Sequence, residues 1–180
     1  MIALIVIDMQ VGLFTDQGPR FDETGVVQRT NELAEAMRAA GGIVVFVQHD
    51  GPPGTLFAPG TPGWAILPSL EQHEGDLVVH KRTNDAFHET GLQSVLEKNA
   101  VAELVVTGCA TEFCVDSTIR AAVSRNFEVT IVSDGHTTAD RPHLKAEQII
   151  EHHNYVWSEL ITRRRVNVTP ASEIRVSNGG

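Results

Sequence analysis

The segment ALIVID, residues 3–8, is an apolar run of mainly branched side chains that stops at a charged residue. Two later runs have the same character: LVVHK, residues 77–81, stops at a lysine, and LVVTG, residues 104–108, stops at a glycine. Near-continuous apolar runs of this length are typical of strands buried on both faces of a parallel sheet. These segments therefore predict an α/β fold with polar groups at the ends of its strands.

Apolar runs of this kind recur along the whole chain. Short apolar runs alternate with stretches of helical periodicity, which predicts a doubly wound α/β domain. A weaker last strand contains three arginines, which favour a place at the edge of the sheet. The expected strands are residues 3–7, 43–48, 77–80, 104–107 and 129–133, with the weaker one at 160–166, and the expected helices are residues 26–40, 90–99, 114–126 and 142–153.

The composition is that of an ordinary globular protein. With 180 residues, 42% hydrophobic and 21% charged, the chain predicts a single domain over residues 1–180. Its net charge of −9 argues against nucleic-acid or anionic-membrane binding, because phosphate contacts need clustered Lys and Arg. No apolar stretch approaches the ~20 residues that cross a bilayer, and the first residues lack the pattern of a signal peptide. We therefore expect a cytoplasmic protein with no nucleic-acid or membrane partner.

Residues 51–63, GPPGTLFAPGTPG, interrupt the α/β rhythm with a loop rich in glycine and proline. This composition excludes a helix or a central strand. A long irregular loop inside a compact domain is more often a lid or binding loop than a spacer. Phe57 in this loop and Trp64 directly after it could form an apolar wall for a substrate, or could pin the loop to the core.

Asp8, Lys81 and Cys114 follow the apolar runs at residues 3–7, 77–80 and 104–107. Ligands of open parallel sheets bind beyond the carboxyl ends of the strands, so these side chains are expected to converge on one pocket. Cys114 is expected near the first turn of a helix, where the positive dipole end and the Lys81 ammonium would favour the thiolate. Asp8 could accept or deliver a proton. An acid, a cation and a thiol together indicate nucleophilic catalysis.

Four elements of the chain resemble the isochorismatase-like cysteine hydrolases, a family that includes nicotinamidases, N-carbamoylsarcosine amidohydrolases and streptothricin hydrolases. They are LIVIDMQVGL at 4–13, VHKRTNDAF at 79–87, VTGCATEFCV at 106–115, and the later pair Ser133 and Asp134. The elements occur in the order found in the family and span most of the chain. The resemblance implies a three-layer fold with a six-stranded, mostly parallel sheet. It also implies homodimers or homotetramers.

The resemblance further implies a catalytic triad of Asp8, Lys81 and Cys114. It implies a cis peptide bond between Cys109 and Ala110, and an oxyanion hole formed by the backbone N–H groups of Ala110 and Cys114. The expected activity is hydrolysis of a C–N amide bond in a small molecule. In this reaction Asp8 takes the thiol proton, Cys114 forms a thioester, and Asp8 protonates the leaving amine.

Nicotinamidases of this family hold a metal with an aspartate and several histidines after the second strand. Here His49 and Asp50 are adjacent, and adjacent strand residues point to opposite faces. We therefore expect neither a metal nor a cofactor, and nicotinamide becomes a less favoured substrate. The side chains expected to line the substrate pocket are Gln10, Phe14, His49, Phe57, Trp64, Asn84 and Phe87.

Two other functions are compatible with the sequence. One is vinyl ether hydrolysis of the isochorismatase type, with Asp8 as the acid and no covalent intermediate; the presence of Cys114 weighs against it. The other is a protein that binds a small molecule or partner without catalysis, against which the intact triad argues.

Overall fold

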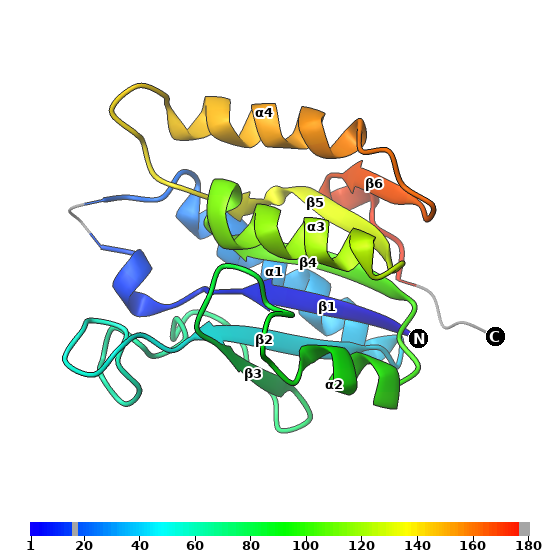
Figure 1. Ribbon diagram of the computed structural model, residues 1–180, viewed down its shortest axis with the longest axis horizontal. Coiled ribbons are helices and arrows are strands. Elements are labelled where there is room, and N and C mark those ends of the chain that lie inside the picture. The colour runs from blue at the N-terminus through cyan, green and yellow to red at the C-terminus, as the bar shows by residue number, and fades with distance from the viewer. Residues whose placement is uncertain (16–17, 177–180) are drawn as a thin grey trace.

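The computed structural model describes residues 1–15 and 18–176. Its centre is a sheet of six parallel strands in the order β3-β2-β1-β4-β5-β6 (Figure 1). The strands are β1 (Ile2–Ile7), β2 (Ile43–His49), β3 (Leu77–Lys81), β4 (Glu103–Cys109), β5 (Glu128–Thr137) and β6 (Val166–Thr169). The helices are α1 (Glu23–Ala39), α2 (Leu92–Lys98), α3 (Asp116–Ser124) and α4 (Ala146–Ser158), and the short helical turns are η1 (Val11–Leu13), η2 (Thr111–Val115) and η3 (Ala171–Glu173).

Helices cover both faces of the sheet and complete three layers. Helix α1 lies on one face, and α2, α3 and α4 lie on the other (Figure 1). Alternate residues of each central strand feed the two cores: Leu4 of β1 packs with Met37 of α1, whereas Ile5 packs with the group that contains Ile119 of α3. This burial on both faces explains why the strands are apolar at nearly every position.

The weak last strand is shorter and begins later than the sequence predicted. Residues 160–165 form a loop, and only the end of the predicted segment belongs to β6. Arg163 and Arg164 are exposed in this loop, and Arg165 pairs with Glu128 at 2.9 Å. Because these charged side chains remain in water, β6 begins only after Arg165. Its position at the edge of the sheet is confirmed.

The register aligns the carboxyl ends of the central strands. Ile7 at the end of β1 lies beside Val47 of β2 and Gly108 of β4. Gly108 has φ +132°, and a Cβ atom there would collide with the Ile7 carbonyl oxygen, so only glycine permits this approach. Asp8 therefore leaves β1 directly beside the turn that carries Cys114.

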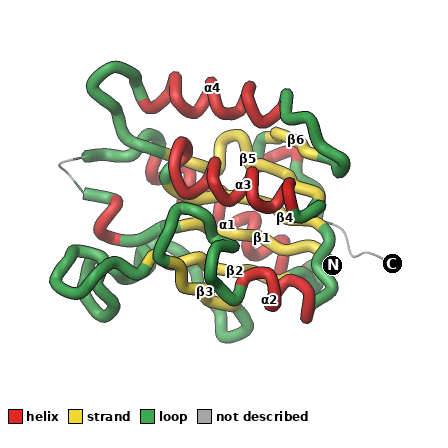
Figure 2. The backbone as a smooth tube through the Cα atoms, viewed as in Figure 1, coloured by secondary structure: helices red, strands yellow, loops and turns green. Residues whose placement is uncertain are grey.

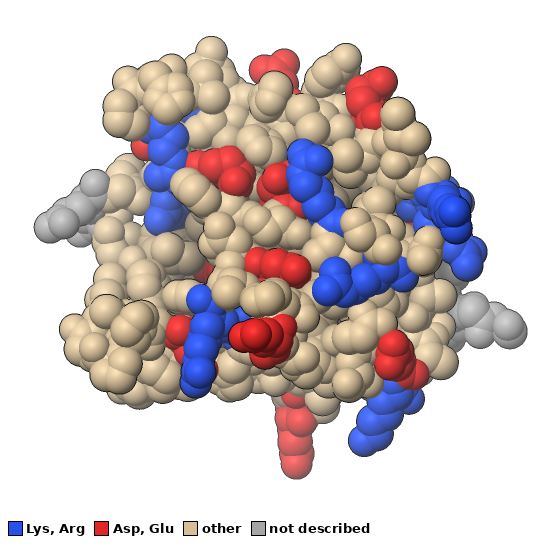
Figure 3. Space-filling view, viewed as in Figure 1, with Lys and Arg blue, Asp and Glu red and all other residues tan. Residues whose placement is uncertain are grey.

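Loops collect at the carboxyl end of the sheet, on the left of Figure 2. On the face shown in Figure 3, basic and acidic side chains are interspersed. Among the helices of the described residues, none has the length and hydropathy needed to cross a membrane.

Candidate active site

Three polar side chains meet beyond the ends of β1, β3 and β4. Asp8 directly follows β1 and has φ +48°, a left-handed conformation that turns the chain out of the strand. Lys81 is the last residue of β3 and pairs in register with His49 of β2. Cys114 lies in η2, a π-helical turn between β4 and α3. The three residues are thus fixed by three different elements, as the sequence predicted from their positions.

Lys81 is the link between the other two side chains. Its Nζ lies 2.6 Å from Asp8 Oδ2 and 3.3 Å from Cys114 Sγ, and it also donates to the Thr83 carbonyl oxygen at 2.9 Å. Strand β2 lies between β1 and β3, so the side chain at position 81 must be long to reach Asp8. The other Asp8 oxygen, Oδ1, is buried and has no hydrogen-bond partner among the described residues.

The proton distribution differs from the expectation of a resting thiolate. Burial, followed by the negative charge of Asp8, raises the pKa of the Cys114 thiol to about 12, and the Lys81 ammonium offsets only part of this effect. Burial also raises the pKa of Asp8 above its ordinary value, against the opposing effect of Lys81. The helix end and the lysine were visible in the sequence, but the burial and the nearby carboxylate outweigh them. Burial and the Asp8 charge thus favour the neutral thiol, against the effect of Lys81.

Ala110 and Cys114 lie in the same turn and both line the cavity. The peptide bond between Cys109 and Ala110 is cis, and Ala110 begins the turn that carries Cys114. Among the hydrogen bonds of the described residues, none uses the Ala110 N–H as donor, and none joins the Cys114 N–H to a group outside η2. The oxyanion hole expected from these two N–H groups stays a prediction.

Asp8 and Cys114 line a cavity of about 290 Å³ at the carboxyl end of the sheet. Of the side chains that the sequence predicted for the pocket, Gln10, His49, Phe57 and Asn84 are part of its lining. The remaining lining residues are Leu13, Arg20, Ala110, Phe113 and Arg141. Leu13, Arg20, Phe113 and Arg141 were missed because each lies on a loop or turn whose path periodicity does not define; for Phe113 the motif around Cys114 was a usable signal.

Three residues expected in the pocket lie elsewhere. Phe87 is buried under α3, where its ring stacks on Phe127. Trp64 donates from Nε1 to Asp50 Oδ1 at 2.7 Å and stacks on His80, so it anchors the loop instead of lining the cavity. Phe14 packs toward the core on the α1 side. All three aromatic residues lie close in sequence to residues of the site, but none of them is part of the cavity lining.

Gln10 and Asn84 have different surroundings within the lining. Gln10 is held at both ends of its amide: Oε1 accepts from the His49 N–H at 2.8 Å, and Nε2 donates to the Trp64 carbonyl oxygen at 2.8 Å. It therefore joins β2 to the loop. Asn84 Oδ1 lies 3.6 Å from Cys114 Sγ, close enough to contact a group bound to the sulfur.

The residues near His49 do not fit a metal site. Asp50 is occupied by Trp64 and by His80 Nδ1 at 3.0 Å, whereas His49 faces the cavity. Burial and the Lys81 charge lower the pKa of His49, which leaves its ring neutral. Across the part of the chain that the structure describes, no group of three or more His, Cys, Asp or Glu side chains is arranged to hold a metal ion.

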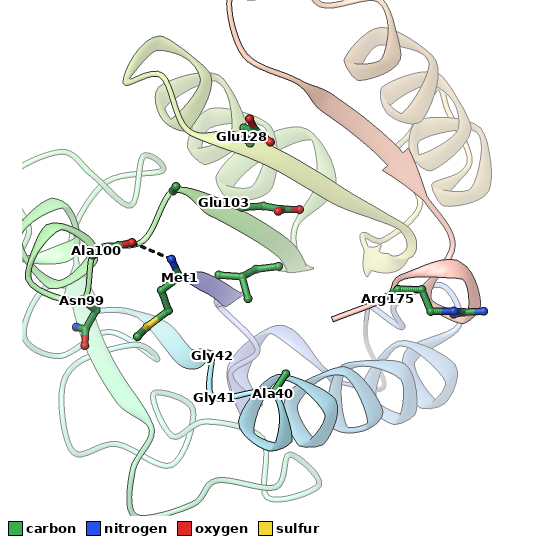
Figure 4. A pocket seen from close by; sticks show the side chains of 11 residues that line it. Met1, Ala40, Gly41, Gly42, Asn99, Ala100, Glu103, Glu128 and Arg175 are labelled. Carbon is green, nitrogen blue, oxygen red and sulfur yellow. Dashed lines mark hydrogen bonds between the residues drawn. The ribbon is translucent and has the colours of Figure 1, made fainter. Parts of the chain in front are cut away.

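A larger cavity, of about 710 Å³, lies at the opposite end of the sheet. Here the Met1 ammonium donates to the Ala100 carbonyl oxygen at 2.9 Å, and Arg175 points away from Met1 (Figure 4). Its lining contains no thiol and no histidine. The chemically equipped cavity is thus the smaller one, at the strand ends where parallel sheets bind ligands.

Comparison with known proteins gives a consistent family. The Isochorismatase domain matches residues 2–163. A streptothricin hydrolase from Streptomyces noursei is 37% identical over 140 residues, which cover 78% of this chain and 51% of the relative. The chain thus spans about half the length of that relative. A ureidoacrylate amidohydrolase from Methylorubrum extorquens is 29% identical over 179 residues, with 79% of this chain and 72% of the relative covered.

Solved structures show the same architecture. An isochorismatase from Pseudomonas putida superposes with a TM-score of 0.88 at 27% identity, covering 97% of this chain and 90% of that one. A cysteine hydrolase from Pseudomonas syringae pv. phaseolicola gives a TM-score of 0.85 at 25% identity, covering 96% and 89%. The α/β fold and the resemblance drawn from the sequence motifs are confirmed.

Proposed function

Because the chain belongs to the isochorismatase family, we propose that it is a cysteine hydrolase that cleaves a C–N amide bond of a small molecule. The single observation that carries this proposal is the contact of Lys81 with both Asp8 and Cys114, two residues that line the cavity. Relatives named as a streptothricin hydrolase and a ureidoacrylate amidohydrolase support it.

The reaction begins with proton transfer from Cys114 to Asp8. The unpartnered Asp8 Oδ1 is the acceptor, and its raised pKa makes it a stronger base than an exposed carboxylate. Because the pKa of the thiol is also raised, the thiolate forms only as the sulfur attacks. Lys81 stays beside both groups and compensates the negative charge, whichever of the two carries it.

The attack converts the substrate carbonyl into a tetrahedral oxyanion. The N–H groups of Ala110 and Cys114 would donate to this oxygen. One donor of this kind typically lowers a barrier by about 2.7–4 kcal/mol. The sulfur–carbon bond forms as the carbonyl π electrons move to oxygen, so no cofactor is required for this step.

Collapse of the oxyanion breaks the C–N bond. Asp8, now protonated, gives its proton to the leaving nitrogen and returns to the carboxylate. Water then attacks the Cys114 thioester with Asp8 as general base, and the thiol regains its proton. The net change is amide plus water to carboxylic acid plus amine.

Vinyl ether hydrolysis remains a second candidate because one observation favours it. A buried carboxyl group with a raised pKa, as at Asp8, is suited to donate a proton to a substrate. That reaction needs no nucleophile. Replacing Cys114 should therefore abolish amide hydrolysis but leave vinyl ether hydrolysis intact.

The deciding experiment is turnover of a panel of small amides, ureido compounds and vinyl ethers by wild type, Cys114→Ala and Cys109→Ala. Cys109 is the matched control, because it is fully buried and does not line the cavity. The proposal expects amide turnover in wild type and in Cys109→Ala, none in Cys114→Ala, and an acyl adduct on Cys114 by intact-protein mass spectrometry. Amide turnover by Cys114→Ala would overturn it. Vinyl ether turnover that survives Cys114→Ala would establish the second candidate, and tight binding without turnover would indicate a binding protein.

A further inference from the structure

A buried histidine contacts the turn that carries Cys114. His136 belongs to β5, is 1% exposed and pairs in register with Gly108 of β4. It does not line the cavity, and the proposed reaction does not use it. Both of its ring nitrogens make hydrogen bonds, Nδ1 with Thr111 Oγ1 and Nε2 with Asn154 Oδ1, each at 2.9 Å. These two partners fix the orientation of the ring.

The partners of His136 also fix the position of its proton. Asn154 Nδ2 donates to the Ser133 carbonyl oxygen at 2.9 Å, so its Oδ1 faces the ring as an acceptor. Nε2 of the ring therefore carries the proton, and Nδ1 accepts from the Thr111 hydroxyl. Burial lowers the pKa of His136 to about 4, which keeps the ring in this neutral form. The hydrogen bonds thus run in one direction, from Thr111 to the backbone of β5.

The turn η2 is a rare kind of backbone structure. Its closing bond runs from the Val115 N–H to the Ala110 carbonyl oxygen at 3.2 Å, five residues back, and the Phe113 N–H donates to the same oxygen at 3.0 Å. Single π-helical turns of this kind are found mostly at functional sites. Contacts between the side chains of the turn and neighbouring elements are therefore expected to decide where Cys114 Sγ lies.

Helix α4, which lies on the same face of the sheet as α3 (Figure 1), contacts both ends of this turn. At the start, the fully buried Thr111 is linked to Asn154 through His136. At the end, Asp116, the first residue of α3, accepts from Trp157 Nε1 at 2.8 Å. Asn154 and Trp157 are three positions apart and so lie on the same face of α4. The nucleophile thus lies between two points at which α4 holds the chain.

We propose that His136 is a positioning residue for the proposed reaction, because its bonds to Thr111 and Asn154 hold the turn that carries the nucleophile. The proposal rests on the proposed function for the identity of the reaction. Cys114 Sγ must reach the substrate carbonyl from its place 3.3 Å from Lys81 Nζ. A misplacement of about 1 Å can cost about a hundredfold in rate. The hydrogen bonds of His136 therefore act on the rate of attack and not on the binding of the substrate.

The test uses variants that change one end of this hydrogen-bond chain. Thr111→Val removes the donor to His136 and keeps the branched shape, whereas Thr111→Ser keeps the donor. Asn154→Ala removes the partner on α4, outside the cavity. Thr130→Val is the matched control. Thr130 is also buried and donates to Glu103 Oε1 at 3.3 Å, but it lies near the opposite end of β5 from His136.

Turnover of an amide that wild type hydrolyses is measured at a temperature at which urea unfolding shows every variant to be folded. Thr111→Val should lower kcat by roughly tenfold to a hundredfold with little change of KM. Asn154→Ala should lower kcat by a smaller factor, and tests the proposal if Thr111→Val does not fold. Thr111→Ser and Thr130→Val should stay close to wild type. An unchanged kcat in folded Thr111→Val and Asn154→Ala, or an equal loss in Thr130→Val, would overturn the proposal.

The reaction of Cys114 with iodoacetamide tests the positioning without any substrate. Release of the turn exposes the thiol, and burial is the main cause of its raised pKa. Thr111→Val and Asn154→Ala should therefore be labelled faster than wild type at pH 7, with labelling read by peptide mass spectrometry. Thr111→Ser and Thr130→Val should be labelled at the wild-type rate. Equal labelling rates in all of these proteins would show that the turn keeps its place without His136.

These outcomes are separable from a failure of the proposed function. Faster labelling of Thr111→Val in a protein that hydrolyses no amide would keep the positioning of Cys114 by His136 and reject the reaction. Amide hydrolysis by wild type, with kcat and labelling rate unchanged in Thr111→Val, would keep the reaction and reject the positioning role.

Discussion

Lys81 Nζ lies 2.6 Å from Asp8 Oδ2 in an ion pair whose two side chains are 0% and 2% exposed. Moving two charges out of water costs several kcal/mol per ion, and only their mutual attraction and further hydrogen bonds offset this. Each residue is therefore stable in its charged form only while the other is present. This dependence links the stability of the fold to the chemistry of the site.

Removing the lysine should destabilise the protein strongly. Lys81→Met leaves the Asp8 carboxylate buried without its cation, and breaking a buried pair in this way costs about 3–5 kcal/mol. Urea unfolding at neutral pH measures the loss. The double variant Asp8→Asn, Lys81→Met removes both charges and should recover a large part of it; a double variant as unstable as Lys81→Met would show that the lysine acts by packing instead of charge.

Asp8→Asn should make Cys114 more acidic while abolishing amide turnover. The negative charge of Asp8 raises the pKa of the thiol and Lys81 lowers it, so the variant keeps only the lowering charge. The pH at which iodoacetamide labels Cys114 at half its maximal rate should shift downward relative to wild type. Cys109, fully buried and with its thiol pKa raised to about 12 by burial, is the internal control and should stay unlabelled. An upward shift would mean that Asp8 favours the thiolate at rest.

His136 should make the fold sensitive to acid. Its Nδ1 accepts from Thr111 Oγ1 at 2.9 Å and its Nε2 donates to Asn154 Oδ1 at 2.9 Å, which joins the Cys114 turn to α4. Burial lowers the pKa of this ring from 6.5 to about 4. The folded state thus binds fewer protons than the unfolded state, so the stabilisation is complete above pH 6.5 and is lost as the pH falls through about 4.

Over that interval His136 should account for about 3 kcal/mol of lost stability. His136→Gln supplies one donor and one acceptor but does not titrate, so urea unfolding of the two proteins at pH 7 and pH 4 isolates the effect. Wild type should lose more stability than the variant on acidification. Equal losses would show that His136 is not the responsible group.

Trp64→Phe should weaken substrate binding with little effect on the chemical step. The variant keeps a ring against His80 but loses the hydrogen bond to Asp50, so residues 51–63, which carry the cavity-lining Phe57, are held less firmly. We expect KM to rise several-fold and kcat to change little.

Trp157→Phe is the matched control for this variant. Trp157 makes the same kind of bond, from Nε1 to Asp116 Oδ1 at 2.8 Å, but lies in the core outside the cavity. It should lower stability without raising KM. A similar rise of KM in both variants would attribute the effect to general loosening of the fold.

The sequence by itself determined the central strands and the meeting of Asp8, Lys81 and Cys114. Strands buried on both faces must be apolar at almost every position, so their ends are visible as the points where polar residues begin. In a parallel sheet those ends all lie at one edge, which brings residues distant in sequence together. The sequence placed the edge strand β6 too early, because its half-exposed residues do not form a continuous apolar run.

Only the tertiary structure revealed the remaining side chains that line the cavity and the shift in the pKa of the thiol. Arg20 and Arg141 reach it from loops, whose paths are set by contacts such as those with the Leu13 carbonyl and Glu112. The raised pKa of Cys114 follows from burial and from a carboxylate more than a hundred positions away in the chain. Solvation and charge depend on the whole set of neighbours in space, whereas strand patterns depend on neighbours in sequence.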